Sequence, residues 1–302
     1  MENAKILVPL DFSDLSIRAL KAAEVFAVML EGTITPFHSY LPMSELDGPY
    51  MLGLGPTPTE DYDEMESILL DRIDEVAREN VDPSVLGKSV ISVGNPAHAI
   101  ADEGKKHDMI VMSTHGRTGF TRLFLGSVAE KVLRISHAPV LIIDKESKIK
   151  PVENVMITTD FSENSHAAFP YLKAIVKASG AHAELLNIMS YDPQHDDRPD
   201  DSKISLREQR LNVLAKEELH EISDMLTTKV LVSSDTPHEA ILNYNLNNPH
   251  DLILMATVGR TGIDYLMMGS TTANIVRHVK TPVLSINPRR RDESEDAGGD
   301  ED

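Results

Sequence analysis

The architecture of this chain can be inferred from residues 108–144, DMIVMSTHGRTGFTRLFLGSVAEKVLRISHAPVLIID, and from their looser repeat at residues 251–287, DLILMATVGRTGIDYLMMGSTTANIVRHVKTPVLSIN. A repeat this long indicates two copies of one module rather than one large domain. Each copy reads as an apolar strand, a glycine-bearing loop, a helix opened by Gly-Ser and a second apolar strand. The module is therefore of the α/β type.

The loop and the helix start are suited to binding phosphate. Gly116 and Gly119 let the backbone approach a ligand closely, and Gly126-Ser127 opens the helix whose N-terminus attracts anions. The repeat keeps the pattern at Gly259 and at Gly269-Ser270. Alternatively, glycines and a serine at a helix start form an ordinary turn with an N-cap. The residues alone leave both interpretations open.

The spacing of these residues resembles that of the universal stress protein family. Gly116 is followed by nine residues and Gly126-Ser127, a Pro-Leu-Asp-Phe-Ser segment follows the first strand, and the last strand reads Pro-Val-Leu. The second half repeats the spacing, so the chain resembles a tandem member of the nucleotide-binding branch. One departure is that Ser113 and Ala256 stand where that branch has its first glycine.

The resemblance implies an adenine-nucleotide site in each half. The aspartate after the first strand would lie against the nucleoside, and a backbone group at the end of the second strand would pair with the adenine edge. The aspartates could instead only complement a helix dipole, and Arg117 and Arg260 could contact phosphates or solvent. The predicted cofactor-binding residues are Pro9, Leu10, Asp11, Ser39, Met112, Ser113, Gly116, Arg117, Gly119, Gly126, Ser127, Val128, Thr158, Thr159, Asp160, Ile188, Ala256, Gly259, Arg260, Gly269, Ser270 and Thr271.

Composition excludes several other classes of protein. The 302 residues carry a net charge of −19 and no cysteine, so a nucleic-acid backbone would be repelled and thiolate zinc sites are excluded. No apolar run approaches the length of a membrane span, so we expect a cytoplasmic protein without a membrane partner. The histidines are scattered and no carboxylate cage is visible, so we expect no dedicated metal site.

Strands alternate with helices five times in each half. This pattern predicts two tandem, doubly wound, parallel five-stranded sheets of the Rossmann-like, adenine-nucleotide alpha-hydrolase-like class. We expect modules at residues 1–145 and 152–288, a linker at 146–151 and a disordered charged tail at 289–302. The resemblance implies that the last strands, Val140–Ile143 and Val283–Ile286, join the halves as an intramolecular pseudo-dimer, and it leaves a homodimer open.

The two halves are not equivalent in sequence. Copy two has Asp235 where copy one has Gly94, and Val258 where copy one has His115. A carboxylate near a phosphate site is unfavourable, so we expect copy one to bind nucleotide better. The sequence also predicts helices over Glu64–Asn80 and Ser205–Met225 and third strands at Ser89–Val93 and Lys229–Ser233.

Three functions fit these features. The favoured one is a stress-response module that binds ATP, with AMP and ADP as alternatives and with Mg²⁺ carried on the phosphates. The second is a slow ATPase or adenylyl-transfer enzyme, although no placed general base supports more than weak ATP hydrolysis. The third is a nucleotide-free interaction protein, which Ser113 and Ala256 favour.

Overall fold

The computed structural model describes residues 1–41, 60–114, 125–195, 197–257 and 269–288. The first half contains β1 (Lys5–Pro9), α1 (Asp14–Met29), β2 (Thr33–Tyr40), α3 (Glu60–Asn80), the 3₁₀ helix η1 (Pro83–Val85), β3 (Val90–Val93), α4 (Pro96–Gly104), β4 (Met109–Ser113), α5 (Ser127–Ile135) and β5 (Val140–Ile143). The second half contains β6 (Asn154–Thr158), α6 (Glu163–His166), α7 (Phe169–Ser179), β7 (His182–Ser190), α8 (Asp201–Glu218), the 3₁₀ helix η2 (His220–Met225), β8 (Leu226–Ser233), α9 (Pro237–Asn247), β9 (Leu252–Ala256), α10 (Ser270–His278) and β10 (Val283–Ile286).

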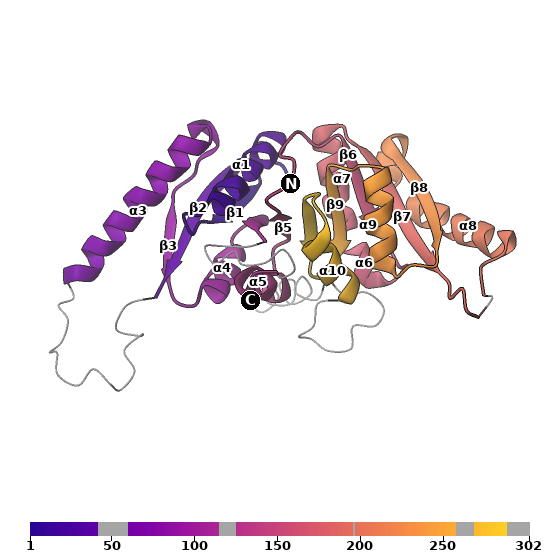
Figure 1. The fold of residues 1–302 in the computed structure, drawn as a ribbon. Coiled ribbons are helices and arrows are strands. Elements are labelled where there is room, and N and C mark those ends of the chain that lie inside the picture. The colour runs from indigo at the N-terminus through magenta and orange to yellow at the C-terminus, as the bar shows by residue number, and fades with distance from the viewer. Residues whose placement is uncertain (42–59, 115–124, 196, 258–268, 289–302) are drawn as a thin grey trace, which may run out of the picture.

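The strands of both halves form one ten-stranded sheet in the order β3-β2-β1-β4-β5-β10-β9-β6-β7-β8. Within each half all pairings are parallel, which confirms the predicted doubly wound architecture. At the centre β5 and β10 pair antiparallel, with Leu284 opposite Leu141. The two last strands thus meet as the family resemblance implied, and α3 and α8 lie at opposite ends of the molecule (Figure 1).

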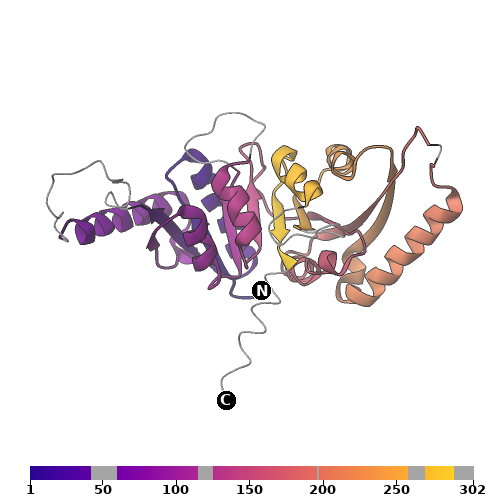
Figure 2. The ribbon, with the colours of Figure 1, turned by 90° about the horizontal axis from the view of Figure 1, so that it is seen from below.

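Helices cover both faces of this sheet, because its strands are apolar on both sides. Ile6 and Val8 of β1 belong to the hydrophobic cluster under α1, α3, α7 and α8, whereas Leu7 belongs to the cluster under α4, α5, α9 and α10. Both clusters contain residues from both halves. The two modules therefore share their core, and Figure 2 shows helices on both sides of the central strands.

A few contacts outside the sheet also join the halves. Arg277 of α10 lies 3.8 Å from Glu130 of α5, and the Asn287 side chain donates a hydrogen bond to the Arg134 carbonyl. In the segment that connects the halves, Arg18 of α1 donates to the Ser147 carbonyl at 2.6 Å. Hydrogen bonds thus hold the connection against α1.

The prediction of one helix over Ser205–Met225 is wrong at both ends. The helix begins earlier because the Asp200 side chain caps it by accepting from Lys203 N. It ends at Glu218 because Leu219 and Ile222, both almost fully buried, leave helical geometry to reach the core. The predicted third strand of the second half also begins too late, since β8 pairs with β7 from Leu226 onward.

Other predicted features lie outside the described residues. These are the tail at 289–302 and the loop residues His115 and Val258. Within the described part of the chain, no helix is both long and apolar enough to span a bilayer.

Candidate functional site

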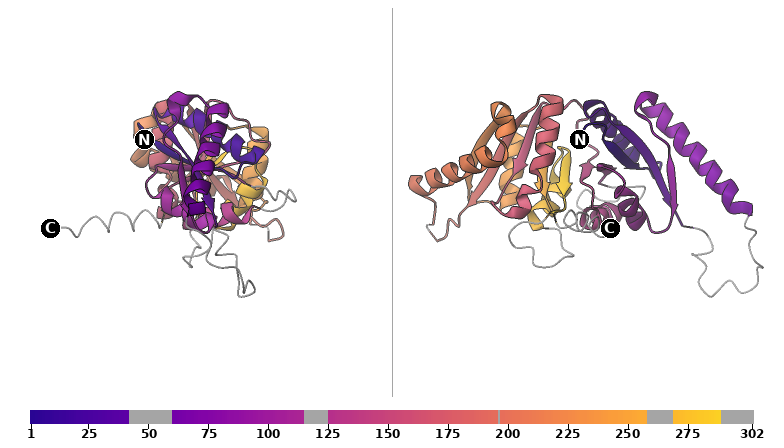
Figure 3. Two further views of the ribbon diagram at one scale, coloured as in Figure 1. Left: turned by 90° about the vertical axis from the view of Figure 1, so that its left-hand side faces the viewer. Right: turned by 180° about the vertical axis from the view of Figure 1, so that it is seen from behind.

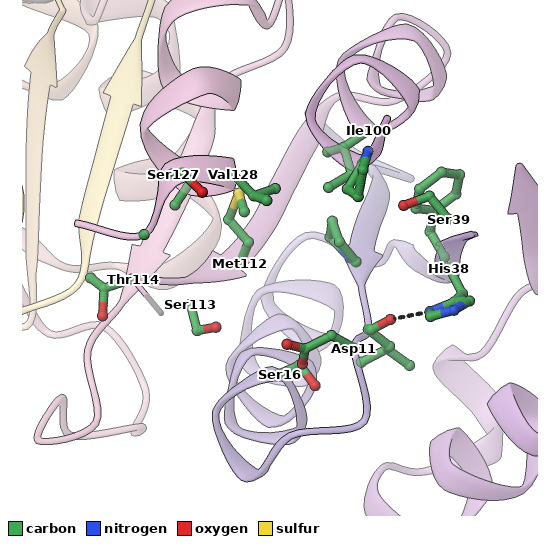
Figure 4. Close-up of a pocket in the computed structure, with 16 residues that line it drawn as sticks. Asp11, Ser16, His38, Ser39, Ile100, Met112, Ser113, Thr114, Ser127 and Val128 are labelled. Atoms are coloured by element: carbon green, nitrogen blue, oxygen red, sulfur yellow. Dashed lines mark hydrogen bonds between the residues drawn. The ribbon is translucent and has the colours of Figure 1, made fainter. Parts of the chain in front are cut away.

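Each half contains a cavity at the carboxyl ends of its strands. The first has a volume of about 270 Å³ and is bounded by the ends of β1, β2 and β4 and by the first turn of α5. In Figure 4, Asp11 and Ser16 lie on one side of it, Met112, Ser127 and Val128 on another, and His38 and Ser39 on a third. The second cavity, of about 290 Å³, is bounded by β6, β7, β9 and α10 in the same way. Both volumes lie near the lower end of the range for ligand pockets.

The helix that opens into each cavity lacks a side-chain cap. Gly126 is the N-cap of α5 and Gly269 is the N-cap of α10, and neither N-cap supplies a side-chain capping hydrogen bond. Ser127 and Ser270 are the first helical residues and not the caps, so the alternative of an ordinary serine N-cap is wrong. The first-turn N–H groups that a cap would accept from instead border a cavity, which is the arrangement of an anion site.

Other helix starts of the described chain do carry side-chain caps. Ser13 caps α1, Asn95 caps α4 and Asp200 caps α8. At α9, beside the second cavity, Thr236 and Glu239 form a capping box, and the hydrogen bond from the Thr236 hydroxyl lowers the pKa of Glu239. The start of α7 also lacks a side-chain cap, but the starts of α5 and α10 combine a glycine N-cap with a cavity in front of the first turn.

A turn with an unusual backbone holds an aspartate at the other side of each cavity. Asp11 Oδ1 accepts hydrogen bonds from Ser13 N at 3.1 Å and Ser13 Oγ at 2.6 Å. Asp160 Oδ1 accepts the same pair from Ser162, at 3.0 Å and 2.5 Å. Each aspartate lines its cavity and precedes the helix N-cap by two residues.

Two side chains that were not predicted from the sequence hold the turn around each aspartate. His38 Nδ1 donates to the Leu10 carbonyl at 2.7 Å, the bond drawn in Figure 4. At the equivalent position, Asn187 Nδ2 donates to the Thr159 carbonyl at 2.8 Å. The carbonyl can only accept, so the bonded His38 nitrogen must carry the proton. The available signal was a hydrogen-bonding side chain at the same position, directly after two apolar residues or one, in the second strand of each half.

Each predicted binding residue that the structure describes lines a cavity. In the first cavity these are Pro9, Leu10, Asp11, Ser39, Met112, Ser113, Gly126, Ser127 and Val128. In the second they are Thr158, Thr159, Asp160, Ile188, Ala256, Gly269, Ser270 and Thr271. Gly116, Arg117, Gly119, Gly259 and Arg260 lie outside the described residues. That any of these residues binds a nucleotide stays a prediction.

Asp235 does not lie where it could weaken phosphate binding in the second cavity, as the sequence had suggested. The Asp235 side chain is exposed, it accepts a hydrogen bond from Asn243 Nδ2 at 3.3 Å, and it does not line the cavity. Its carboxylate is held by Asn243, an exposed residue of α9. The second cavity has its own lining cation, Arg207 of α8, which the sequence analysis did not identify.

Comparison with known proteins gives a consistent result. The chain matches the model of the universal stress protein family over residues 2–144 and again over residues 151–287. It is 34% identical over 151 residues to a universal stress protein of Methanocaldococcus jannaschii, an alignment that covers 48% of this chain and 84% of that protein.

Solved structures share the whole fold. A universal stress protein from Archaeoglobus fulgidus matches with a TM-score of 0.66 at 24% identity, covering 95% of this chain and 97% of that one. A protein of Pseudomonas aeruginosa described as a putative universal stress protein matches with a TM-score of 0.63 at 14% identity, covering 97% of each chain. The double match of the family model decides the identity: the chain belongs to the universal stress protein family, with one family module in each half.

Proposed function

We propose that this universal stress protein binds an adenine nucleotide in each cavity and that occupancy regulates its interactions in a stress response. ATP is the favoured ligand, with AMP and ADP as alternatives. The observation that carries the proposal is the same in both halves. An uncapped helix start borders one side of the cavity, and a carboxylate held in a hydrogen-bonded turn borders another.

The uncapped helix start supports phosphate binding. The first-turn N–H groups and the helix dipole attract anions, and the Ser127 or Ser270 hydroxyl adds a donor. Ser113 and Ala256, which replace a family glycine, line the cavities at the ends of β4 and β9. Because both side chains are small, they leave room for a ligand beside the strand.

The aspartate turn supports recognition of the nucleoside. A carboxylate only accepts hydrogen bonds, so Asp11 and Asp160 suit the hydroxyl groups of a ribose. Ser39 and Ile188 line the same cavities from the ends of β2 and β7 and offer main-chain groups for the adenine edge. Among the described residues no group of three His, Asp or Glu side chains could hold a metal. Mg²⁺ would therefore enter on the phosphates.

The proposal extends to the organisation of the chain. Residues 1–145 and 152–288 form the two nucleotide-binding modules, with residues 146–151 as the linker. The antiparallel pairing of β5 with β10 supports a built-in pseudo-dimer. Since both modules share their core across this pairing, nucleotide in one cavity can influence the other half.

Mass spectrometry of the protein purified under native conditions should detect co-purified adenine nucleotide. Calorimetry with ATP should then give two sites in the parent chain and one site in Gly126→Asp and in Gly269→Asp, because the new carboxylate repels phosphate. Gly126→Asn and Gly269→Asn, which add a similar side chain without charge, serve as controls and should retain more affinity. ATP binding that is unchanged in both aspartate variants would contradict the proposal.

A further inference from the structure

The outer helices of the two halves, α3 and α8, differ in whether they contribute a residue to the cavity. Arg207 of α8 lines the second cavity, whereas α3, the matching helix of the first half, contributes none of the described lining residues. The buried residues Ile73 of α3 and Leu211 of α8 place the two helices in register. One helical turn earlier, Leu69 stands where the second half has Arg207. The second cavity has therefore gained a cation.

Arg207 is one of three arginines in this part of the second half that pack on aromatic rings. The Arg207 and Arg210 guanidinium carbons lie 5.5 Å and 4.3 Å from the centroid of the Phe161 ring. The Arg198 guanidinium carbon lies 5.9 Å from the Tyr191 ring. Of the three, Arg207 is the one that lines the second cavity.

The corresponding part of the first half has a carboxylate instead. The Tyr40 hydroxyl, at the end of β2, donates to Glu66 of α3 at 2.5 Å, and the Phe12 ring packs against His38 with centroids 5.0 Å apart. The outer helices thus differ: α8 places Arg207 in the second cavity, whereas α3 places Glu66 against the end of β2. The two cavities have similar volumes but different charged groups supplied by these helices.

Arg207 lies at the aspartate side of the second cavity, away from the uncapped helix start. It packs against Phe161, the residue that follows Asp160. Asp160 lines the same cavity and is the carboxylate proposed to bind the ribose. Arg207 therefore faces the sugar or base end of a bound nucleotide.

We propose that the second cavity, unlike the first, selects an adenine nucleotide that carries a second phosphate on its ribose, and that Arg207 recognises this phosphate. The inference rests on the proposed function, since the 5′-phosphate must lie at Gly269-Ser270. A guanidinium binds phosphate through paired hydrogen bonds, which gives the extra group both affinity and orientation. Arg207 is thus a specificity-determining residue of one half only.

The test compares AMP with adenosine 3′,5′-bisphosphate and adenosine 2′,5′-bisphosphate by calorimetry. The full chain carries Gly126→Asp, so that only the second cavity binds. One bisphosphate should bind at least about tenfold more tightly than AMP, as expected of a charge-assisted pair. Arg207→Leu, which installs the first half's residue, should reduce this preference to about twofold or less. Arg207→Lys should retain part of the preference.

Arg210→Leu is the matched control, because Arg210 packs on the same ring but does not line the cavity. It should keep the preference, and circular dichroism should show that both leucine variants are folded. A chain carrying Gly269→Asp, with only the first cavity open, should show no preference. Equal affinity for AMP and both bisphosphates in the second cavity would overturn the inference but leave the proposed function intact. Absence of any adenine-nucleotide binding would overturn both.

Discussion

Phe12 and Phe161 hold the same uncommon backbone conformation, with φ of +64° in each half. A bulky residue in the left-handed region costs roughly 1–2 kcal/mol, and such a cost persists where the surroundings enforce it. Here it turns the preceding aspartate toward the cavity while the following serine caps the helix. The repetition of this strained turn in both halves indicates that the position of the carboxylate matters to the protein.

Replacing the Asp11 carboxylate by an amide of the same shape tests whether its charge contributes to nucleotide binding. We expect Asp11→Asn to weaken ATP binding in the first cavity about tenfold, because a hydrogen bond to a charged group contributes about 1.5–3 kcal/mol. Calorimetry on the Gly269→Asp background measures this directly. Ser13→Ala is the comparison: it loosens the carboxylate and removes the cap of α1 but keeps the charge. A larger loss of affinity in Ser13→Ala than in Asp11→Asn would argue against direct contact with the nucleoside.

Some residues of the cavities could be predicted from the sequence and others could not. Asp11 and Asp160 were predicted from the resemblance of their Asp-Phe-Ser segments to the family pattern, since an aspartate before a helix could by itself only complement the helix dipole. The His38 bond to Leu10 and the entry of Arg207 into the second cavity depend on how distant elements pack. Asp235 was misjudged for the same reason, since only the fold shows that its side chain points away from the cavity.

At the scale of the helix, the starts of α5 and α10 forgo a stabilising cap. Gly126 has φ −58° and ψ 140°, close to Asn95, the N-cap of α4, with φ −60° and ψ 124°. A side-chain cap would therefore fit without backbone strain, and its absence supports the proposed anion site at this end of the helix. Natural proteins accept such small losses of stability at binding sites.

Gly126→Asp should consequently have opposite effects on stability and on binding. We expect the free energy of unfolding to rise by about 0.3–1 kcal/mol, because the carboxylate accepts from first-turn N–H groups and complements the dipole. ATP affinity of the first cavity should fall at the same time. Gly126→Asn should share the cap without the charge. Thermal unfolding in the absence and presence of ATP separates the two effects, and a variant that loses both stability and binding would point to misfolding instead.

Beyond the cavities, α9 and β7 share a buried polar network with its own pH dependence. Tyr244 donates to Glu184 Oε1 at 2.8 Å, and His250 Nε2 lies 3.3 Å from Glu184 Oε2. Burial opposes ionisation of Glu184, but the hydrogen bonds from His250 and Tyr244 outweigh it, so the pKa of Glu184 lies below 4.5. Burial and the bond to Glu184 raise the pKa of Tyr244 to about 12.

A lowered pKa in the folded state means that ionised Glu184 stabilises the protein above the pKa of the unfolded chain, near 4.5. This contribution should be lost as the pH falls below that value. Glu184→Gln should reduce the free energy of unfolding by about 1–3 kcal/mol at pH 7 and flatten its decline between pH 5 and 3, about the window of carboxylate titration. Denaturant unfolding at a series of pH values measures the slope. An equal slope in both proteins would exclude this role for Glu184.

The element boundaries show what the local pattern can specify. The limits of β2, β5 and β10 agree with the sequence because turn residues or prolines bound each apolar run. The end of α8 and the start of β8 were missed because Leu219 and Ile222 are drawn into the core, where tertiary packing overrides helical periodicity. Long-range packing thus fixes boundaries that the residues themselves leave open.

For the molecule as a whole, the central pairing of β5 with β10 unites two repeats into one cooperative unit. Leu141 and Leu284 face each other across it and are fully buried. Leu284 belongs to a cluster that extends from Ala4 to Ile286. The right view of Figure 3 shows the two halves side by side from behind. A substitution at the β5–β10 pairing should therefore destabilise both modules.

Leu284→Ala should lower the free energy of unfolding by about 2–5 kcal/mol, as buried leucine truncations do. Both halves should still unfold together in a single calorimetric transition. Hydrogen exchange followed by mass spectrometry should show reduced protection in β4 as well as in β9. Leu206→Ala, which removes a side chain that is 68% exposed, should have little effect. Loss of protection in the second half alone would mean that the modules are independent.

The covalent seam between the halves also has an evolutionary consequence. In an assembly of two identical chains, every substitution enters both pockets at once, so the two can only change together. Here the partner strand is always supplied by the same gene product, and each pocket inherits its own substitutions. One half could therefore acquire an arginine at its rim while the other kept its ancestral preference. A chain of this kind carries its two cavities in a fixed one-to-one ratio.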